Sequence, residues 1–356
     1  MSLDTLAHIS RDNYLIAKIR GERSYMLEPQ QLHSLAESRS VSEIIALLAE
    51  GPYGPATSKV QTGSSVVEFE HAIISTFTES FRQLLLASRG DTREFLVKYK
   101  VRLDAYDFAA LALFKAAGRT WDEYLETRRP LSGKREQDLH RLYTVEDLGS
   151  LAHDLGNRFV VARLKDSSQA DLEGEKSALL RDIITGWGEE QFYHYAEKMS
   201  GVDKRNCLPI VGSAVDITNV LIILRSKLIG ATNVKAHLVP AKWKLNAEAI
   251  EQLTAFQDAP QGLDFMASHY YYSRLFTGAR QKFEDFKSLT FLEIALRQHQ
   301  LRLSRRVFLG FPYTVGIVHA YLVYMENEAR NIAAILTGVD AGLGADEIRS
   351  LLATPE

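Results

Sequence analysis

Hydrophobic residues recur at spacings of three and four along most of the chain, which is the period of an amphipathic α-helix. The clearest stripe runs from Val66 to Leu85 and is followed by Gly90. Similar stripes cover residues 15–27, 148–164, 192–199, 217–229, 291–303 and 317–336. Strict alternation of apolar and polar residues, the pattern of a half-buried strand, extends over no stretch long enough for a sheet. The pattern therefore predicts an almost wholly α-helical protein.

Three stretches of the chain superimpose without gaps at a spacing of 112 residues. Each has an acid, a small polar residue three positions later and a glycine: Asp104, Asp107 and Gly118; Asp216, Asn219 and Gly230; Glu328, Asn331 and Gly342. Glycine in this place is typical of the left-handed residue that ends a helix. Self-similarity at a fixed spacing is the sequence signature of a repeated structural unit. We interpret the chain as three copies of one helical unit.

Nearly all prolines fall between the apolar stripes, as expected if they mark connections. Pro130 and Pro240 are natural boundaries between the copies. We therefore expect three helical modules over residues 1–130, 131–240 and 241–356, related by an approximate threefold axis.

Composition narrows the range of functions. A net charge of −3 gives no overall electrostatic attraction to nucleic acid. The single cysteine, Cys207, excludes an intramolecular disulfide and a thiolate metal site. Residues 1–10 lack the cationic start and apolar block of a secretory signal, and the apolar stretches are interrupted by Lys or Arg well short of the ~20 residues that span a membrane. We expect a cytoplasmic protein with no membrane span.

The repeated acid and its polar neighbour share one helical face, because residues three apart lie one turn apart. In the second copy Asp216 and Asn219 lie beside each other, and Arg225 follows near the helix end, where the helix dipole favours a cation. One interpretation is structural: these side chains bind nearby backbone or an arginine of a neighbouring module, since a buried charge needs a partner. The other is functional: three helices line a shared opening and present polar faces to a partner.

The third copy carries a longer signature, in which Tyr-Leu precedes Glu-x-Glu-Ala-Arg-Asn-Ile and a glycine: Tyr321, Leu322, Glu326, Glu328, Ala329, Arg330, Asn331, Ile332, Ile335 and Gly338. This order resembles the C-terminal signature of the C subunit of archaeal and bacterial V/A-type ATPases, whose eukaryotic relative is vacuolar ATPase subunit d. Residues 13–27, 52–55 and 216–230 are similar to the family's opening helix, early turn and central segment. The resemblance extends more loosely over the whole chain.

The resemblance implies an all-α funnel of three similar modules with a central opening. It implies that the funnel stands on the membrane rotor ring of proteolipid subunits and that its opening receives the foot of the central shaft. The chain would then be a peripheral, non-catalytic socket without a cofactor, which couples ATP hydrolysis or synthesis on other subunits to ion transport. Its candidates for structural or partner contacts are Asp104, Asp107, Asp216, Asn219, Arg225, Glu328, Arg330 and Asn331.

Two other functions remain open at this point. A helical scaffold unrelated to rotation would keep the repeats but bind another partner. A helical-bundle enzyme would hold Mg²⁺ on Asp104 and Asp107, although a second acidic cluster on a facing helix is not evident. The sequence contains no phosphate-binding loop, no two-histidine helical metal motif and no activated nucleophile motif.

Two surface features complete the sequence interpretation. The basic cluster Arg297, Arg302, Arg305 and Arg306 fits a solvated helix face, or a face near lipid headgroups or the acids of a partner. The run Tyr270 to Tyr272 fits an interface in part, because interfaces are enriched in tyrosine.

Overall fold

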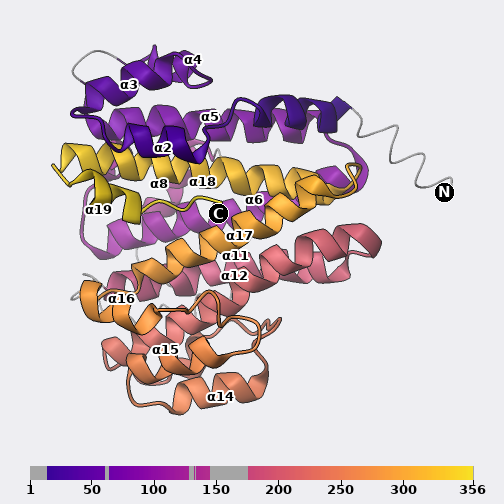
Figure 1. Ribbon diagram of the computed structural model, residues 1–356, viewed down its shortest axis with the longest axis vertical. Coiled ribbons are helices and arrows are strands. Elements are labelled where there is room, and N and C mark those ends of the chain that lie inside the picture. Colours follow the sequence, from indigo (N-terminus) through magenta and orange to yellow (C-terminus); the bar gives the residue numbers. More distant parts are fainter. Residues whose placement is uncertain (1–13, 61–63, 128–131, 133, 145–174, 356) are drawn as a thin grey trace.

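The computed structural model describes residues 14–60, 64–127, 132, 134–144 and 175–355 (Figure 1). Within these residues every regular element is a helix and none is a strand, which confirms the all-α prediction. The stripe at residues 148–164 and the boundary at Pro130 lie outside the described residues.

Six helices of 20 to 28 residues form the body of the described part: α5 Val66–Ala87, α6 Gly90–Ala116, α11 Glu175–Lys198, α12 Gly201–Leu228, α17 Thr290–Leu309 and α18 Val315–Asp340. In space α11 packs along both α6 and α12, α17 packs against α12 and α18, and α5 packs against α18. These helices cross the middle of the molecule side by side in Figure 1.

Shorter helices extend the two ends of this body. At one end, beside α12, lie α13 Val234–His237, α14 Ala247–Ala255, α15 Ala259–Ser268 and α16 Ala279–Phe286 (Figure 1). At the other lie α2 Pro29–Leu35, α3 Val41–Ala49, α4 Gly54–Thr57 and α19 Ala345–Ser350. Residues 14–23 are also helical, and α7 Trp121–Thr127 and α8 Glu136–Tyr143 follow α6.

The first and last segments that the structure describes share one hydrophobic core. Leu32 and Ile44 of the first short helices are buried against Ile332 of α18 and Ile348 of α19. A separate core joins α12 to the short helices α14 to α16. The first helices therefore pack on the last long helix.

The helices α6, α12 and α18 end in the same hydrogen-bonded turn. Gly118, Gly230 and Gly342 have φ angles of 67°, 65° and 72°, in the left-handed region that favours glycine. The amide after each glycine donates to the carbonyl five residues earlier, with N···O distances of 3.1, 2.8 and 2.9 Å. This is the Schellman arrangement, and it confirms the expected glycine ends at Gly118 and Gly230. In the third copy Gly338 lies inside α18, and Gly342 ends the helix.

Among the described helices, α12 alone contains a stretch long and apolar enough to be compared with a membrane span. By length and composition it could cross a bilayer, but 83% of its most apolar stretch is buried inside the protein. Val220 and Leu224, for example, pack in the core with α14 and α15. Pro209 lies inside this helix, so it is an exception to the expectation that prolines mark connections.

Candidate functional site

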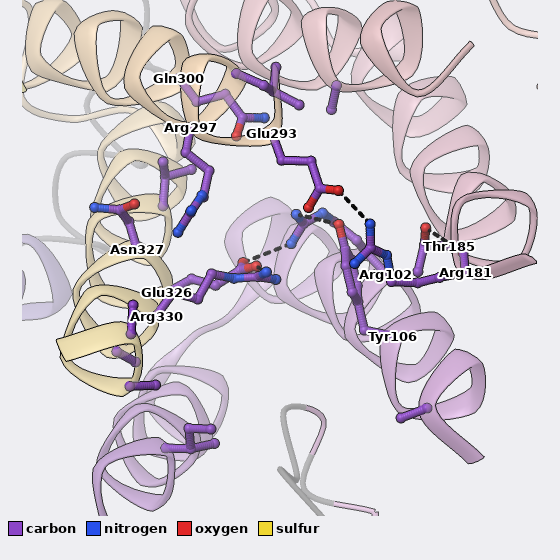
Figure 2. Close-up of a pocket in the computed structure, with 18 of the residues that line it drawn as sticks. Arg102, Tyr106, Arg181, Thr185, Glu293, Arg297, Gln300, Glu326, Asn327 and Arg330 are labelled. Atoms are coloured by element: carbon purple, nitrogen blue, oxygen red, sulfur yellow. Dashed lines mark hydrogen bonds and ion pairs between the residues drawn. The ribbon is translucent and has the colours of Figure 1, made fainter. Parts of the chain in front are cut away.

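A cavity of about 680 Å³ lies between the six long helices α5, α6, α11, α12, α17 and α18. Three sets of its lining residues are spaced by 112: Tyr99, Val211 and Val323; Arg102, Ala214 and Glu326; Tyr106, Thr218 and Arg330. The three helices that carry the repeated signature therefore present equivalent positions to one space. Figure 2 labels Arg102, Tyr106, Glu326 and Arg330 of these sets.

The size of the cavity limits what it can hold. One turn of α-helix is 5.4 Å long and 10 to 12 Å wide with its side chains, and so occupies roughly 420 to 610 Å³. By volume alone, the cavity is comparable to about one helical turn.

An ion-pair network centred on Glu326 closes one side of the cavity. Arg102 donates to Glu326 at 2.8 Å and to Glu189 at 2.7 Å, and Arg330 donates to the other oxygen of Glu326 at 2.8 Å. The hydroxyl of Tyr99 donates to Glu326 at 2.8 Å. Burial raises the pKa of Glu326, but the two guanidinium groups more than offset burial and hold its pKa well below its ordinary value. The network ties α6, α11 and α18 together in the charged state.

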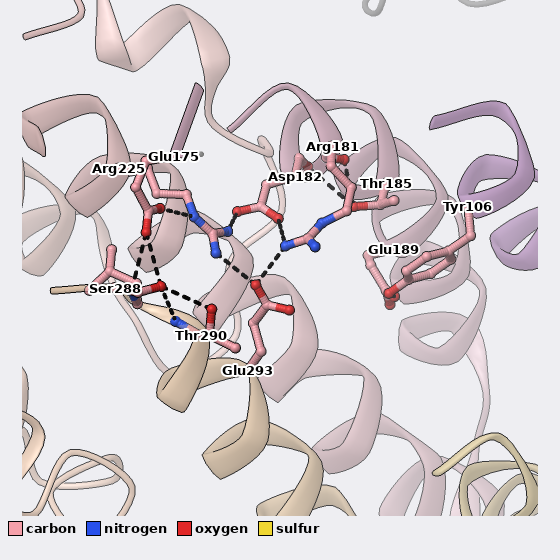
Figure 3. A network of polar contacts seen from close by, with 11 residues as sticks. Tyr106, Glu175, Arg181, Asp182, Thr185, Glu189, Arg225, Ser288, Thr290 and Glu293 are labelled. Atoms are coloured by element: carbon pink, nitrogen blue, oxygen red, sulfur yellow. Dashed lines mark hydrogen bonds and ion pairs between the residues drawn. The ribbon is translucent and has the colours of Figure 1, made fainter. Parts of the chain in front are cut away.

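A second network, centred on Arg225, lies at the junction of α11, α12 and α17 (Figure 3). The guanidinium is 1% exposed and contacts Glu175 at 2.8 Å, Glu293 at 2.6 Å and Asp182. Arg181 also binds Glu293, at 2.6 Å. Burial alone would lower the pKa of Arg225, but Asp182 and Glu293 raise it above its ordinary value. Arg225 thus holds three segments together as a permanent cation.

The small polar residue of each repeat binds a backbone segment that follows its helix. Asp107 accepts a hydrogen bond from the amide of Ser132 at 3.0 Å. Asn219 accepts one from the amide of Val239 at 2.7 Å, and Asn331 accepts one from the amide of Ala353 at 3.0 Å. The partner residues lie 20 to 25 positions downstream in all three cases.

The acids of the second and third copies also have parallel contacts. Asp216 accepts from the amides of Trp243, Lys244 and Leu245 at 2.7 to 3.0 Å and from the hydroxyl of Tyr272 at 2.6 Å. Burial raises the pKa of Asp216, whereas these four donors oppose that shift.

Glu328 accepts from the amide of Leu27 at 2.8 Å and from the hydroxyl of Tyr53 at 2.6 Å. Leu27 lies directly before Glu28, the N-cap residue of α2. Leu245 likewise lies directly before Asn246, the N-cap residue of α14. Helix α2 therefore meets Glu328 in the way that α14 meets Asp216. This contact joins residues 301 positions apart in the sequence.

Asp104 has a different environment. It pairs with Lys100 at 2.9 Å and with Lys134 at 3.3 Å. Because Asp107 is turned toward Ser132, the two carboxylates that a Mg²⁺ enzyme would need are each bound to other groups. Of the eight candidates from the sequence, Asp107 and Arg330 line the cavity, and the other six bind within the protein around it.

Comparison with known proteins decides the family. The family model of the ATP synthase (C/AC39) subunit matches residues 15–351 of this chain. The chain belongs to this family. The resemblance inferred from residues 321–338 is confirmed.

Several relatives of the C/AC39 chain are archaeal A-type ATP synthase C subunits. The protein from Methanocaldococcus jannaschii is 22% identical over 352 residues, which cover 95% of this chain and 85% of the relative. The protein from Pyrococcus abyssi is 22% identical over 96% of this chain and 90% of the relative. The protein from Haloferax volcanii is 23% identical over 96% of this chain and 97% of the relative. The similarity thus extends over nearly the full length of each.

Sequence reasoning singled out Arg330 of the cavity wall in this C/AC39 family member but missed its charged partners on other helices, Arg102 and Glu189. Two positions before each repeated acid lies a further set of residues at the same spacing of 112: Arg102, Ala214 and Glu326. The spacing could therefore have identified them. Arg181 and Glu293 are also 112 apart and bind each other. In the basic cluster expected on α17, Arg297 lines the cavity, whereas Arg305 and Arg306 are exposed.

Proposed function

We propose that this chain is the non-catalytic socket of a rotary A/V-type ATPase, which joins the central shaft to the proteolipid ring in the membrane. Rotation of the shaft, driven by ATP hydrolysis on other subunits, would pass through this chain to the ring. Ion transport and ATP synthesis would use the same connection. The chain would lie on the cytoplasmic side as a peripheral component.

The observation that carries this proposal is the cavity lined by equivalent positions of α6, α12 and α18. Three positionally equivalent helices around one space suit an axial partner, because an axle contacts every side of the opening. The volume, comparable to that of about one helical turn, suits the narrow end of a helical partner. Membership of the C/AC39 family supports the assignment to the ATPase.

We also propose that the body consists of three copies of one unit, each a long signature helix with the short segments bound to its acid and polar residue. The contacts of Glu328 with Leu27 and Tyr53 support a third unit that is completed by the first helices of the chain. Under this proposal the segments after residues 130 and 240 belong with the preceding signature helices, because Ser132 binds Asp107 of α6 and residues 243–245 bind Asp216 of α12. Residues 14–57 belong in space with the third unit. Torque would then act on a body in which the first described helices are bound to the last long helix, α18.

Binding of purified components tests the socket. The full chain, mixed with the shaft subunits and the proteolipid ring of the same ATPase, is expected to form a complex with each and a ternary complex with both. Ala110 is exposed and lines the cavity, so Ala110→Trp should fill part of the space and weaken shaft binding at least tenfold while leaving ring binding unchanged. Size-exclusion chromatography and titration calorimetry would measure both.

Ala87→Trp serves as the matched control, because Ala87 is exposed near the end of α5 and does not line the cavity. It should bind shaft and ring like the unmodified chain. Failure of the unmodified chain to bind either component would reject the socket. Equal shaft binding by Ala110→Trp and Ala87→Trp would show that the shaft does not use this cavity.

A further inference from the structure

Arg297 extends from the inner face of α17 into the cavity (Figure 2). Glu293, Arg297 and Gln300 are spaced by four and three residues, which places them on one helical face, and all three line the cavity. Arg305 and Arg306, further along the same helix, are exposed. Arg297 is therefore the cation of α17 that an occupant of the cavity would meet.

Every carboxylate of the described cavity wall is already bound by another group. Glu326 is held by Arg102 and Arg330, and Glu189 by Arg102. The others are Asp182 and Glu293, which bind Arg181 and Arg225, and Asp107, which binds Ser132.

Arg297, by contrast, makes no ion pair or hydrogen bond with the residues that the structure describes, and Figure 2 draws no interaction from it. Glu293, one turn away on the same helix, already accepts from two other guanidinium groups.

Burial of the Arg297 guanidinium is unfavourable for the folding free energy of the isolated chain. Burial, and then repulsion by Arg330, lower the pKa of Arg297 to about 10, which still leaves it protonated at neutral pH. Glu293 and Glu326 attract the Arg297 cation but only partly oppose this shift, and neither forms an ion pair with it. Burying a cation without an ion-pair partner is unfavourable. An anion that entered the cavity would offset this cost, because charges attract more strongly where water is excluded.

We infer that Arg297 receives a carboxylate at the tip of the protein segment that enters the cavity. The inference deepens the proposed socket function and rests on it. A guanidinium matches a carboxylate in planar, two-point geometry, which favours this chemistry over a neutral amide or hydroxyl. The carboxylate belongs either to an acidic side chain or to the chain end of that segment.

Titration of the purified shaft subunits with variants of the full chain tests the inference. Arg297→Gln is expected to weaken shaft binding by about thirtyfold or more, because a buried charge pair loses one partner. Arg297→Lys keeps the charge but not the two-point geometry and should recover part of the loss. Arg306→Gln, an exposed change on the same helix, should leave the affinity unaltered.

Stability of the isolated chain separates a binding role from a structural one. If Arg297 serves to bind an anion from outside the chain, it does not stabilise the isolated chain. Arg297→Gln and Arg297→Met should then unfold at the same urea concentration as the unmodified chain or at a higher one. A marked decrease in the unfolding midpoint would instead show that Arg297 supports the fold, and it would overturn the inference.

Changes in the shaft identify the carboxylate. Each acidic residue of the inserted shaft segment is changed to its amide (Asp→Asn or Glu→Gln), and the chain end of the segment is amidated. One of these changes should weaken binding to the unmodified chain but not to Arg297→Gln. A side-chain change or the terminal amide would then name the source. Inorganic phosphate is the remaining probe. If Arg297→Gln abolishes phosphate binding but leaves the affinity for the shaft unchanged, the site binds a free anion and the inference is wrong.

The two proposals fail in different ways. If the unmodified chain does not bind the shaft, the socket is rejected. If the unmodified chain binds the shaft and Arg297→Gln binds it equally well, the socket stands and the carboxylate site alone is rejected.

Discussion

Replacing Arg225 by alanine is expected to lower the free energy of unfolding by about 3 to 5 kcal/mol, the range found when one partner of a buried ion pair is removed. Arg225 is 1% exposed and is bound by Glu175, Asp182 and Glu293. Its removal leaves three carboxylates close together, with Arg181 as the remaining nearby cation. Urea unfolding followed by circular dichroism would measure the loss.

Arg280→Ala is the matched control for this change. Arg280 pairs with Asp264 on the surface, where the two side chains are 58% and 49% exposed. Exposed pairs contribute at most about 1 kcal/mol, so this variant should unfold close to the unmodified chain. If Arg225→Ala were no more destabilised than Arg280→Ala, the network would not hold α11, α12 and α17 together.

Stability of the unmodified chain is expected to fall by about 3 kcal/mol, through Glu328 alone, as the pH rises from 4.5 to above 7. Burial raises the pKa of Glu328 from 4.5 to about 7, although the hydroxyl of Tyr53 and the amide of Leu27 oppose the shift. The folded chain therefore binds this proton more tightly than the unfolded chain. The resulting stabilisation is complete below pH 4.5 and is lost as the pH rises through 7.

Glu328→Gln isolates this contribution from the other groups that titrate in the same range. The amide oxygen can accept from Leu27 and the amide nitrogen can donate to the oxygen of Tyr53, so the shape and both contacts are kept. We expect similar stability of the two proteins near pH 4.5 and greater stability of Glu328→Gln at pH 8. Parallel changes of the unfolding free energy with pH in both proteins would contradict a raised pKa at Glu328.

Local features of the fold could be predicted from the sequence because they depend on neighbouring residues. The apolar period predicts the long helices, and glycines 112 residues apart predict their shared left-handed ends. The adjacency of Asp216 and Asn219 follows from helical geometry. Their partners do not follow from it, because the segments at Val239 and Leu245 return to α12 only in the folded chain.

The interior electrostatics could not be predicted in the same way. From the sequence Arg225 is expected at the negative end of its helix, but its three carboxylate contacts depend on how α11 and α17 pack against α12. The tyrosine run is similar: Tyr270 is 76% exposed, whereas Tyr272 is buried on Asp216. Neighbours in sequence thus have different roles, because the segment turns there instead of continuing as a helix.

Ion transport by the assembled ATPase, measured in sealed vesicles with and without this chain, tests the socket most directly. With the chain present, ATP hydrolysis should drive ion uptake at a fixed ratio. Without it, the catalytic sector should continue to hydrolyse ATP while ion uptake falls to the background of vesicles without ATP. Uptake at the normal ratio in the absence of the chain would contradict a mechanical link between shaft and ring.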